Sequence, residues 1–176
     1  MKAIRLRTLA ALASAALPLA ALAQSPAPAA PRAPCATPQD RQFDFWLGDW
    51  NVTDRASGKP AGTNRITSEL KGCVLEEHWN GAGGGNGFSF NHYDAARKLW
   101  HQTWVDDGGG ILYLDGGLRD GAMVLSGRRQ TRAGKTVVDR ITYTHAADGS
   151  VRQHWETSPD GGTTWTTSFD GIYRKR

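Results

Sequence analysis

Short runs of alternating, β-branched and aromatic residues recur from about residue 49 to the C-terminus, with a turn signal about every 8–12 residues. The turns are rich in Gly, Asp and Pro. The pattern predicts strands at 49–54, 63–70, 73–80, 87–93, 99–106, 111–115, 122–130, 136–144, 151–157 and 165–173. Because the links are too short for crossover helices, we expect an all-β, antiparallel, up-and-down barrel of about ten strands.

The N-terminal 23 residues have the pattern of a secretory signal peptide. Basic residues are followed by an Ala/Leu-rich stretch over 9–22 and by the small-x-small sequence Ala21-Leu22-Ala23. Residues 24–38 are rich in Pro and Ala, which predicts a linker, and the barrel domain is expected over 39–176. We therefore expect a periplasmic or secreted protein without stable membrane insertion.

Charge argues against a nucleic-acid partner. The chain has 21 Lys and Arg and 17 Asp and Glu residues. Three of the basic residues precede the predicted cleavage site, so the mature chain has a net charge near +1. No long basic cluster occurs, which argues against nucleic acid as a partner. The partner that we expect is a small, partly apolar molecule. The composition does not indicate an oligomeric state.

Cys35 and Cys73 are the two cysteines of the chain. In an exported protein such a pair predicts one disulfide, with two free thiols as the alternative. Between them, the sequence around Phe43, Trp46 and Leu47 suits one or two helical turns ending at Gly48. We expect this segment to form a short helical plug at one end of the barrel.

Strand alternation groups polar and aromatic side chains on shared faces. A barrel can gather these faces around one lumen, which predicts a ligand site. The predicted binding residues are Glu77, Trp79, Asn91, Gln102, Trp104, Arg140, Gln153 and Trp155. Arg140 is the expected orienting group, with Glu77 or an acidic ligand as its partner. The inward direction stays open, because the opposite faces hold Phe88, Phe90, Val105 and Ile141.

Two local motifs are interpreted mainly as structure. Residues 158–165 match S-x-D-x-G-x-T-W and resemble the Asp-box hairpin of sialidases and other propellers. The Asp accepts backbone N–H bonds, a Gly adopts a positive φ and the Trp packs under the loop. The glycine-rich loop over 81–87 is either a portal flap or a simple hairpin connection.

The sequence predicts no catalytic residues, no metal site and no cofactor. It lacks a G-x-S-x-G elbow, and the histidines show no H-x-H or H-E-x-x-H spacing. His145 and His154 are the late-strand candidates for a haem ligand.

Four strings together carry a family resemblance: Phe43-Asp44-Phe45-Trp46-Leu47-Gly48-Asp49-Trp50, Glu77-His78-Trp79, Ser89-Phe90-Asn91-His92-Tyr93-Asp94 and Trp100-His101-Gln102-Thr103-Trp104-Val105-Asp106. Over most of residues 39–174 the chain resembles a family of secreted bacterial lipocalin-like proteins of unknown function. The first string also resembles the start of calycin barrels. This resemblance implies a calycin-type barrel with a small-molecule cavity, in which Gly48 and Trp50 close one end.

The sequence therefore predicts an exported small-molecule-binding barrel without catalytic activity, whose ligand it does not identify. Two alternatives stay open: an enzyme acting on a small envelope metabolite, and a structural or interaction barrel with a filled lumen. A cavity of several hundred Å³ favours binding, a strongly perturbed carboxylate or His within it favours an enzyme, and a packed lumen favours the third alternative.

Overall fold

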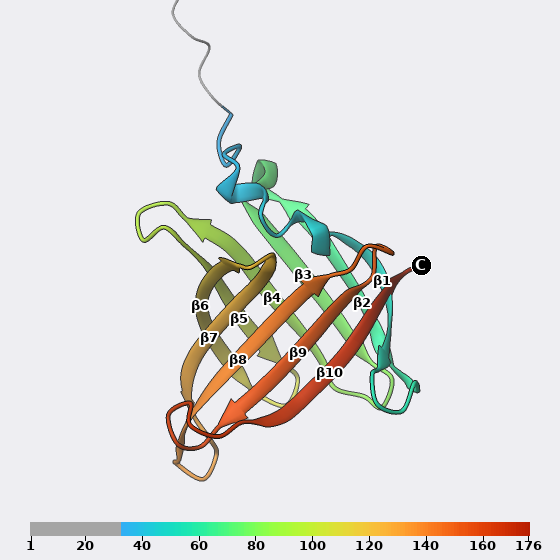
Figure 1. The fold of residues 1–176 in the computed structure, drawn as a ribbon, viewed down its shortest axis with the longest axis vertical. Helices are drawn as coiled ribbons and strands as arrows, with labels where there is room; N and C mark the ends of the chain where they lie inside the picture. Colours follow the sequence, from blue (N-terminus) through green and yellow to red (C-terminus); the bar gives the residue numbers. More distant parts are fainter. Residues whose placement is uncertain (1–32) are drawn as a thin grey trace, which may run out of the picture. The chain divides into compact units, whose positions relative to one another are not determined.

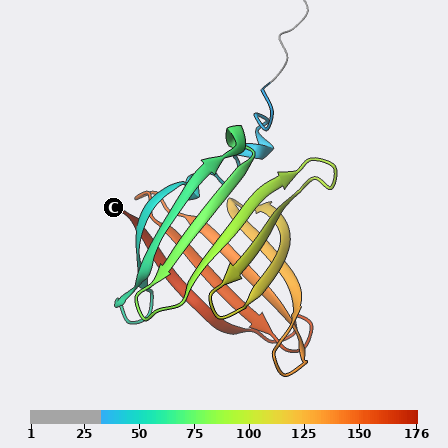
Figure 2. The same ribbon diagram turned by 180° about the vertical axis from the view of Figure 1, so that it is seen from behind.

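The structure is a computed structural model that describes residues 33–176. Ten antiparallel strands form one closed barrel, which confirms the predicted architecture (Figures 1 and 2). They are β1 (Gly48–Asp54), β2 (Pro60–Glu69), β3 (Val74–Gly81), β4 (Asn86–Asp94), β5 (Leu99–Asp106), β6 (Ile111–Arg119), β7 (Ala122–Gln130), β8 (Thr136–His145), β9 (Val151–Ser158) and β10 (Thr166–Lys175). Each strand pairs with its sequence neighbours, and β1 pairs with β10 to complete the cylinder. The predicted signal peptide and residues 24–32 of the predicted linker lie outside the described residues.

β6 extends beyond the end that its sequence predicts. The strand was expected to end at residue 115, and Gly116 and Gly117 follow it. In the structure Gly116 continues the strand and pairs with Leu125 of β7. A Cβ on Gly116 would collide with the backbone carbonyl of Val124, so the glycine permits a close approach of two strands rather than a turn.

One end of the barrel, where β1 begins, is closed by aromatic side chains; we call it the closed end. Two three-residue 3-10 turns, η1 (Gln39–Arg41) and η2 (Asp44–Trp46), lead into β1. Phe43 and Trp46 are fully buried and stack with ring centroids 4.9 Å apart, and Phe43 also contacts Tyr143. The indole of Trp50 donates a hydrogen bond of 2.9 Å to the carbonyl of Trp46. Phe43, Trp46 and Trp50, the aromatic cluster of this end, therefore belong to the hydrophobic core.

A disulfide holds the start of the domain to the closed end. Cys35 is bonded to Cys73, next to the 3-10 turn η3 (Leu70–Gly72) between β2 and β3, as the sequence predicted. Arg41 donates a hydrogen bond to the carbonyl of Gly72 in the same turn.

Within residues 33–176, no helix has the length and apolar character needed to cross a membrane.

The opposite end, which we call the open end, carries the β1–β2, β3–β4, β5–β6, β7–β8 and β9–β10 connections. The glycine-rich segment 81–87 and the Asp-box hairpin both belong to this end. On the barrel wall, Phe88, Phe90 and Val105 face outward and are 41–51% exposed. Their neighbours Glu77, Ser89 and Gln102 are therefore the inward-facing residues, and each is at most 3% exposed.

Candidate functional site

A cavity of about 180 Å³ occupies the lumen between the aromatic cluster and the open end. Its lining comprises Glu77, Trp79, Gln102, Trp104, Leu112, Ile141, Tyr143, Gln153, Trp155, Ser168, Phe169 and Tyr173. Four of these, Trp79, Trp104, Trp155 and Phe169, are half-buried and lie near the strand ends that border the open end. They form the rim of the cavity. The fully buried Tyr143 and Tyr173 lie deeper, toward the closed end.

Glycines on the same or a neighbouring strand make room for the rim aromatics. A Cβ on Gly62 would lie 2.8 Å from the Trp79 ring, and one on Gly171 would lie 2.6 Å from the Phe169 ring. A Cβ on Gly87 would overlap the indole of Trp104. Because the missing Cβ atoms let these rings lie against the wall, the space at the centre of the barrel stays open.

Glu77 is the one carboxyl group among the cavity-lining residues, and it is 3% exposed. Its Oε1 accepts a hydrogen bond of 2.7 Å from the Asn64 amide, and its Oε2 accepts one of 2.6 Å from the Ser89 hydroxyl. No Lys, Arg or His within residues 33–176 forms an ion pair with it. Burial raises the pKa of Glu77 to about 7, against the lowering effect of the two hydrogen bonds.

A directed hydrogen-bond chain leads to Glu77 from the next strands. The Gln102 amide nitrogen donates to Asn91 Oδ1 at 2.8 Å, and the Asn91 amide nitrogen donates to Ser89 Oγ at 2.8 Å. Ser89 in turn donates to Glu77. Gln102 Nε2 also donates to the Tyr143 hydroxyl at 3.2 Å, whereas Gln102 Oε1 is buried and has no hydrogen-bond partner among the described residues.

Two buried phenols complete the polar floor. Burial, together with the neighbouring Glu77, raises the pKa of Tyr143 and of Tyr173 well above the ordinary value, so both are neutral. The Tyr173 hydroxyl donates to Gln153 Oε1. Apart from Glu77, the floor thus consists of amides and neutral hydroxyls.

The structure brings together most of the predicted site residues. Glu77, Trp79, Gln102, Trp104, Gln153 and Trp155 line the cavity. Asn91 is fully buried just behind it and holds Gln102 in place.

The prediction that Arg140 shares the cavity is wrong. The buried residues of β8 are Val137, Asp139, Ile141 and Tyr143, so Arg140 lies on the outer face. Its guanidinium donates to Glu156 at 2.8 Å and lies 3.9 Å from the centre of the Trp165 ring. The proposed pairing with Glu77 is therefore absent. The alternation of β8 was misassigned because both of its faces carry apolar residues.

Asp139 is the polar residue of the lumen that sequence reasoning missed. It is fully buried near the open end and accepts hydrogen bonds from Arg129 at 2.6 Å, from the Trp155 indole at 2.8 Å and from Thr157 at 2.7 Å. It therefore fixes the orientation of one rim aromatic. The correct alternation of β8 would have placed Asp139, Ile141 and Tyr143 inside together.

The Asp-box hairpin has the predicted geometry. Asp160 Oδ1 accepts backbone N–H bonds from Thr163 at 3.0 Å and Thr164 at 2.8 Å. The Trp165 indole donates to the carbonyl of Gly162 at 2.9 Å. The bonds from the backbone and hydroxyl of Thr164, the hydroxyl of Ser158 and the backbone of Thr163 hold the pKa of Asp160 at about 2. The bonds of the hairpin account for the motif as a turn structure.

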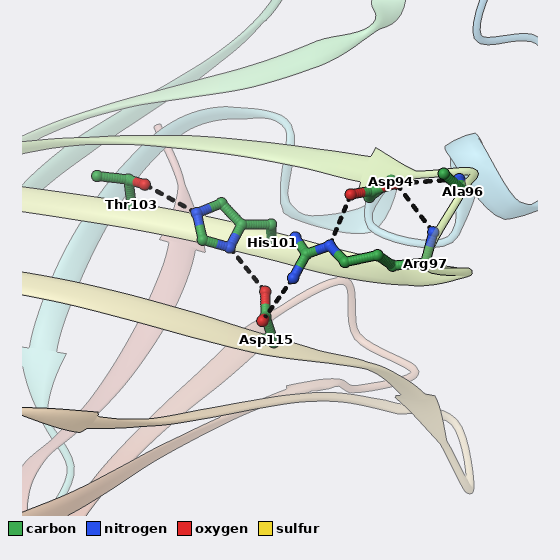
Figure 3. A network of polar contacts seen from close by, with 6 residues as sticks. All are labelled: Asp94, Ala96, Arg97, His101, Thr103 and Asp115. Atoms are coloured by element: carbon green, nitrogen blue, oxygen red, sulfur yellow. Dashed lines mark hydrogen bonds and ion pairs between the residues drawn. The ribbon is translucent and has the colours of Figure 1, made fainter.

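A hydroxyl–imidazole–carboxylate cluster lies on the outer face of β5 and β6 (Figure 3). Thr103 Oγ1 is 2.9 Å from His101 Nε2, and His101 Nδ1 is 2.7 Å from Asp115. Arg97 bonds the second Asp115 oxygen at 2.8 Å and also bonds Asp94 at 2.7 Å. Since the cluster lies away from the cavity and both Asp115 oxygens are bonded, we assign it to holding the β4–β5 turn against β6.

The haem-ligand candidates are also outside the cavity. His154 contacts Thr167 at 3.1 Å on the outer face, and His145 stacks on Phe45 at the closed end. Within residues 33–176, no group of three or more His, Cys, Asp and Glu residues is arranged to hold a metal ion.

No protein-family model matches the chain, and no curated protein matches it either. The cavity is therefore interpreted from its own chemistry.

Proposed function

We propose that this protein is an exported barrel of calycin type that binds a small, largely apolar molecule and does not transform it. The observation that carries the proposal is a cavity at one end of the barrel, with four aromatic side chains around its rim and a buried polar floor. Such a mixture of apolar walls and a few oriented polar groups is typical of ligand pockets. The volume of about 180 Å³ suits a molecule somewhat larger than benzene.

Other features are consistent with this role. The segment 39–47, with Phe43 and Trp46, would act as the plug, leaving one entrance. The Cys35–Cys73 disulfide is consistent with an oxidising compartment, which supports export, together with the N-terminal sequence. The cavity of about 180 Å³ is smaller than the several hundred Å³ expected for a binding barrel, but it supports binding over a barrel with a completely filled lumen.

The binding proposal is tested with 2-phenylethanol, a neutral molecule of suitable size. Titration calorimetry should give saturable 1:1 binding with a Kd on the order of 0.1–1 mM. Leu112→Phe, which fills the cavity from β6, should weaken binding at least tenfold. Val105→Phe, on the outer face of β5, is the matched control and should leave the affinity unchanged. Equal affinities for the wild type and Leu112→Phe would show that the cavity is not the site.

An enzymatic role is the second candidate, because a carboxyl group with a pKa near 7 is suited to general acid–base catalysis. Binding is preferred, since the other polar groups of the floor are amides and neutral phenols. Native mass spectrometry of protein purified from its own periplasm would identify a co-purified ligand. If that ligand is converted by the wild type but not by Glu77→Gln, the protein is an enzyme.

A further inference from the structure

The cavity floor is built to receive positive charge. Every hydrogen bond in the chain from Gln102 through Asn91 and Ser89 points toward Glu77. The Asn64 amide donates to the second oxygen of the same carboxyl group. Glu77 thus receives donors at both oxygens, which is the arrangement that stabilises a carboxylate.

Among residues 33–176 this carboxylate has no positive partner. The polar groups around it are Asn64 on β2, Ser89 on β4, Gln102 on β5, Tyr143 on β8 and Tyr173 on β10, and all of them are neutral. A buried charge without a partner is unfavourable, so the empty barrel favours the protonated acid. A cation in the cavity would reverse this balance.

A second observation on the floor also indicates a hydrogen-bond donor in the ligand. Gln102 is 1% exposed and lines the cavity, and its Oε1 has no hydrogen-bond partner in the part of the chain that the structure describes. Its amide nitrogen is committed to Asn91 and Tyr143, which fixes the side chain in this orientation. An ammonium group has several N–H donors and can bond both Gln102 Oε1 and Glu77.

The rim suits the same kind of ligand. The indoles of Trp79, Trp104 and Trp155 and the ring of Phe169 surround the entrance to the floor. Aromatic rings bury apolar surface and attract cations through their electron-rich faces. An aryl or alkyl body would therefore lie among the rim rings while its charged end reaches the floor.

We propose, on the basis of the binding function above, that the occupant of the cavity is a small organic amine bound as its ammonium ion, with Glu77 as counter-ion and Gln102 Oε1 as second acceptor. Among molecules of similar size, the cavity should prefer those with a positive charge. A neutral isostere would bind more weakly, and an anion would be excluded.

Three probes of matched shape test this: 2-phenylethylamine, 2-phenylethanol and phenylacetate. By calorimetry on the mature chain at about pH 7.5, the amine should bind at least tenfold more tightly than the alcohol, as one charge-assisted hydrogen bond provides. Phenylacetate should not bind. Glu77→Gln should remove the amine's advantage while leaving the alcohol affinity within about twofold. Glu76→Gln, the outward-facing neighbour bonded to His78, should change neither affinity.

The pH dependence of the wild type gives a second readout that needs no variant. Because Glu77 has a pKa of about 7, the affinity for the amine should rise about tenfold from pH 6 to pH 8, with proton release, while the affinity for the alcohol stays constant. If the alcohol binds as tightly as the amine, or if the amine's affinity is independent of pH, the amine inference is overturned and the binding function stands. If none of the probes binds, the binding function and this inference both fail.

Discussion

Glu77 is the residue on which the chemistry of the lumen depends. It is buried, accepts bonds from two donors and pairs with no cationic side chain of residues 33–176, so its charge depends on the pH and on the ligand in the cavity. Its outward neighbour Glu76 faces solvent and His78 instead. Two adjacent glutamates thus have different environments because a strand turns successive side chains to opposite faces.

The free energy of unfolding should depend on pH because the buried Glu77 carboxyl group keeps its proton in the folded state. The folded protein keeps this proton up to a pKa of about 7, whereas the unfolded chain releases it near 4.5. The folded state therefore binds more protons in this window, and this contribution to stability is lost as the pH rises from about 4.5 to 8, by about 3 kcal/mol. Urea denaturation across this range should show the loss in the wild type and Glu76→Gln but not in Glu77→Gln. Parallel curves for all three proteins would contradict the assignment.

At the scale of elements, glycine positions set how much of the lumen is free. Gly62, Gly87 and Gly171 each lie against a rim aromatic. Gly62 and Gly87 come from the strands next to Trp79 and Trp104, whereas Gly171 lies two residues after Phe169 on the same strand, β10. The contacts hold Trp79, Trp104 and Phe169 against the wall. The size of the cavity therefore depends on residues that are absent from its lining.

Gly87→Ala should reduce the cavity. Its Cβ would overlap the Trp104 ring and approach the Val105 carbonyl to 2.7 Å, so the indole must move inward. We expect a destabilisation of about 1–3 kcal/mol and a loss of 2-phenylethanol binding of at least fivefold. Gly117→Ala on β6, where the added Cβ meets nothing within 4 Å, is the control and should change stability and binding little. Unchanged binding in Gly87→Ala would show that the indole yields in another direction.

The strand pattern was predictable, but its inward faces were predictable only in part. On β3 and β5 the inward face combines Glu77, Trp79, Gln102 and Trp104. This polar–aromatic mixture was the reason to expect a cavity lining, although the sequence left the inward direction open. On β8, Val138 and Ile141 place apolar residues on both faces, so the alternation gave no direction and Arg140 was misplaced. The orientation became clear only from pairing with β9, which puts Arg140 beside Glu156.

At the scale of the whole molecule, the closed end of the barrel contributes stability and the open end carries the cavity. Every strand is paired on both sides, so the sheet has no free edge. The aromatic cluster and the Cys35–Cys73 bond stabilise the closed end, whereas the cavity lies toward the open end. Stability and binding should therefore respond to different substitutions.

Removing the disulfide tests this division. Cys35→Ser/Cys73→Ser releases a link between residues 38 positions apart, and the chain-entropy relation gives a loss of about 4 kcal/mol as an upper value. Urea denaturation should show this loss, while the Kd for 2-phenylethanol stays within about twofold of the wild type. Alkylation followed by intact mass measurement without reductant should find no free thiol in the wild-type protein. A matching loss of binding would show that the two ends are coupled.

Both ends of the described chain lie at the closed end of the barrel, opposite the entrance to the cavity. Residues 35–47 and the C-terminal Arg176, whose backbone bonds Asp49, meet where β1 begins (Figure 1). A surface, tag or fused domain attached at either terminus would therefore leave the entrance facing outward. The barrel could be immobilised or joined to a reporter without obstructing the cavity, and the indoles of its rim would serve as a built-in fluorescent signal of occupancy.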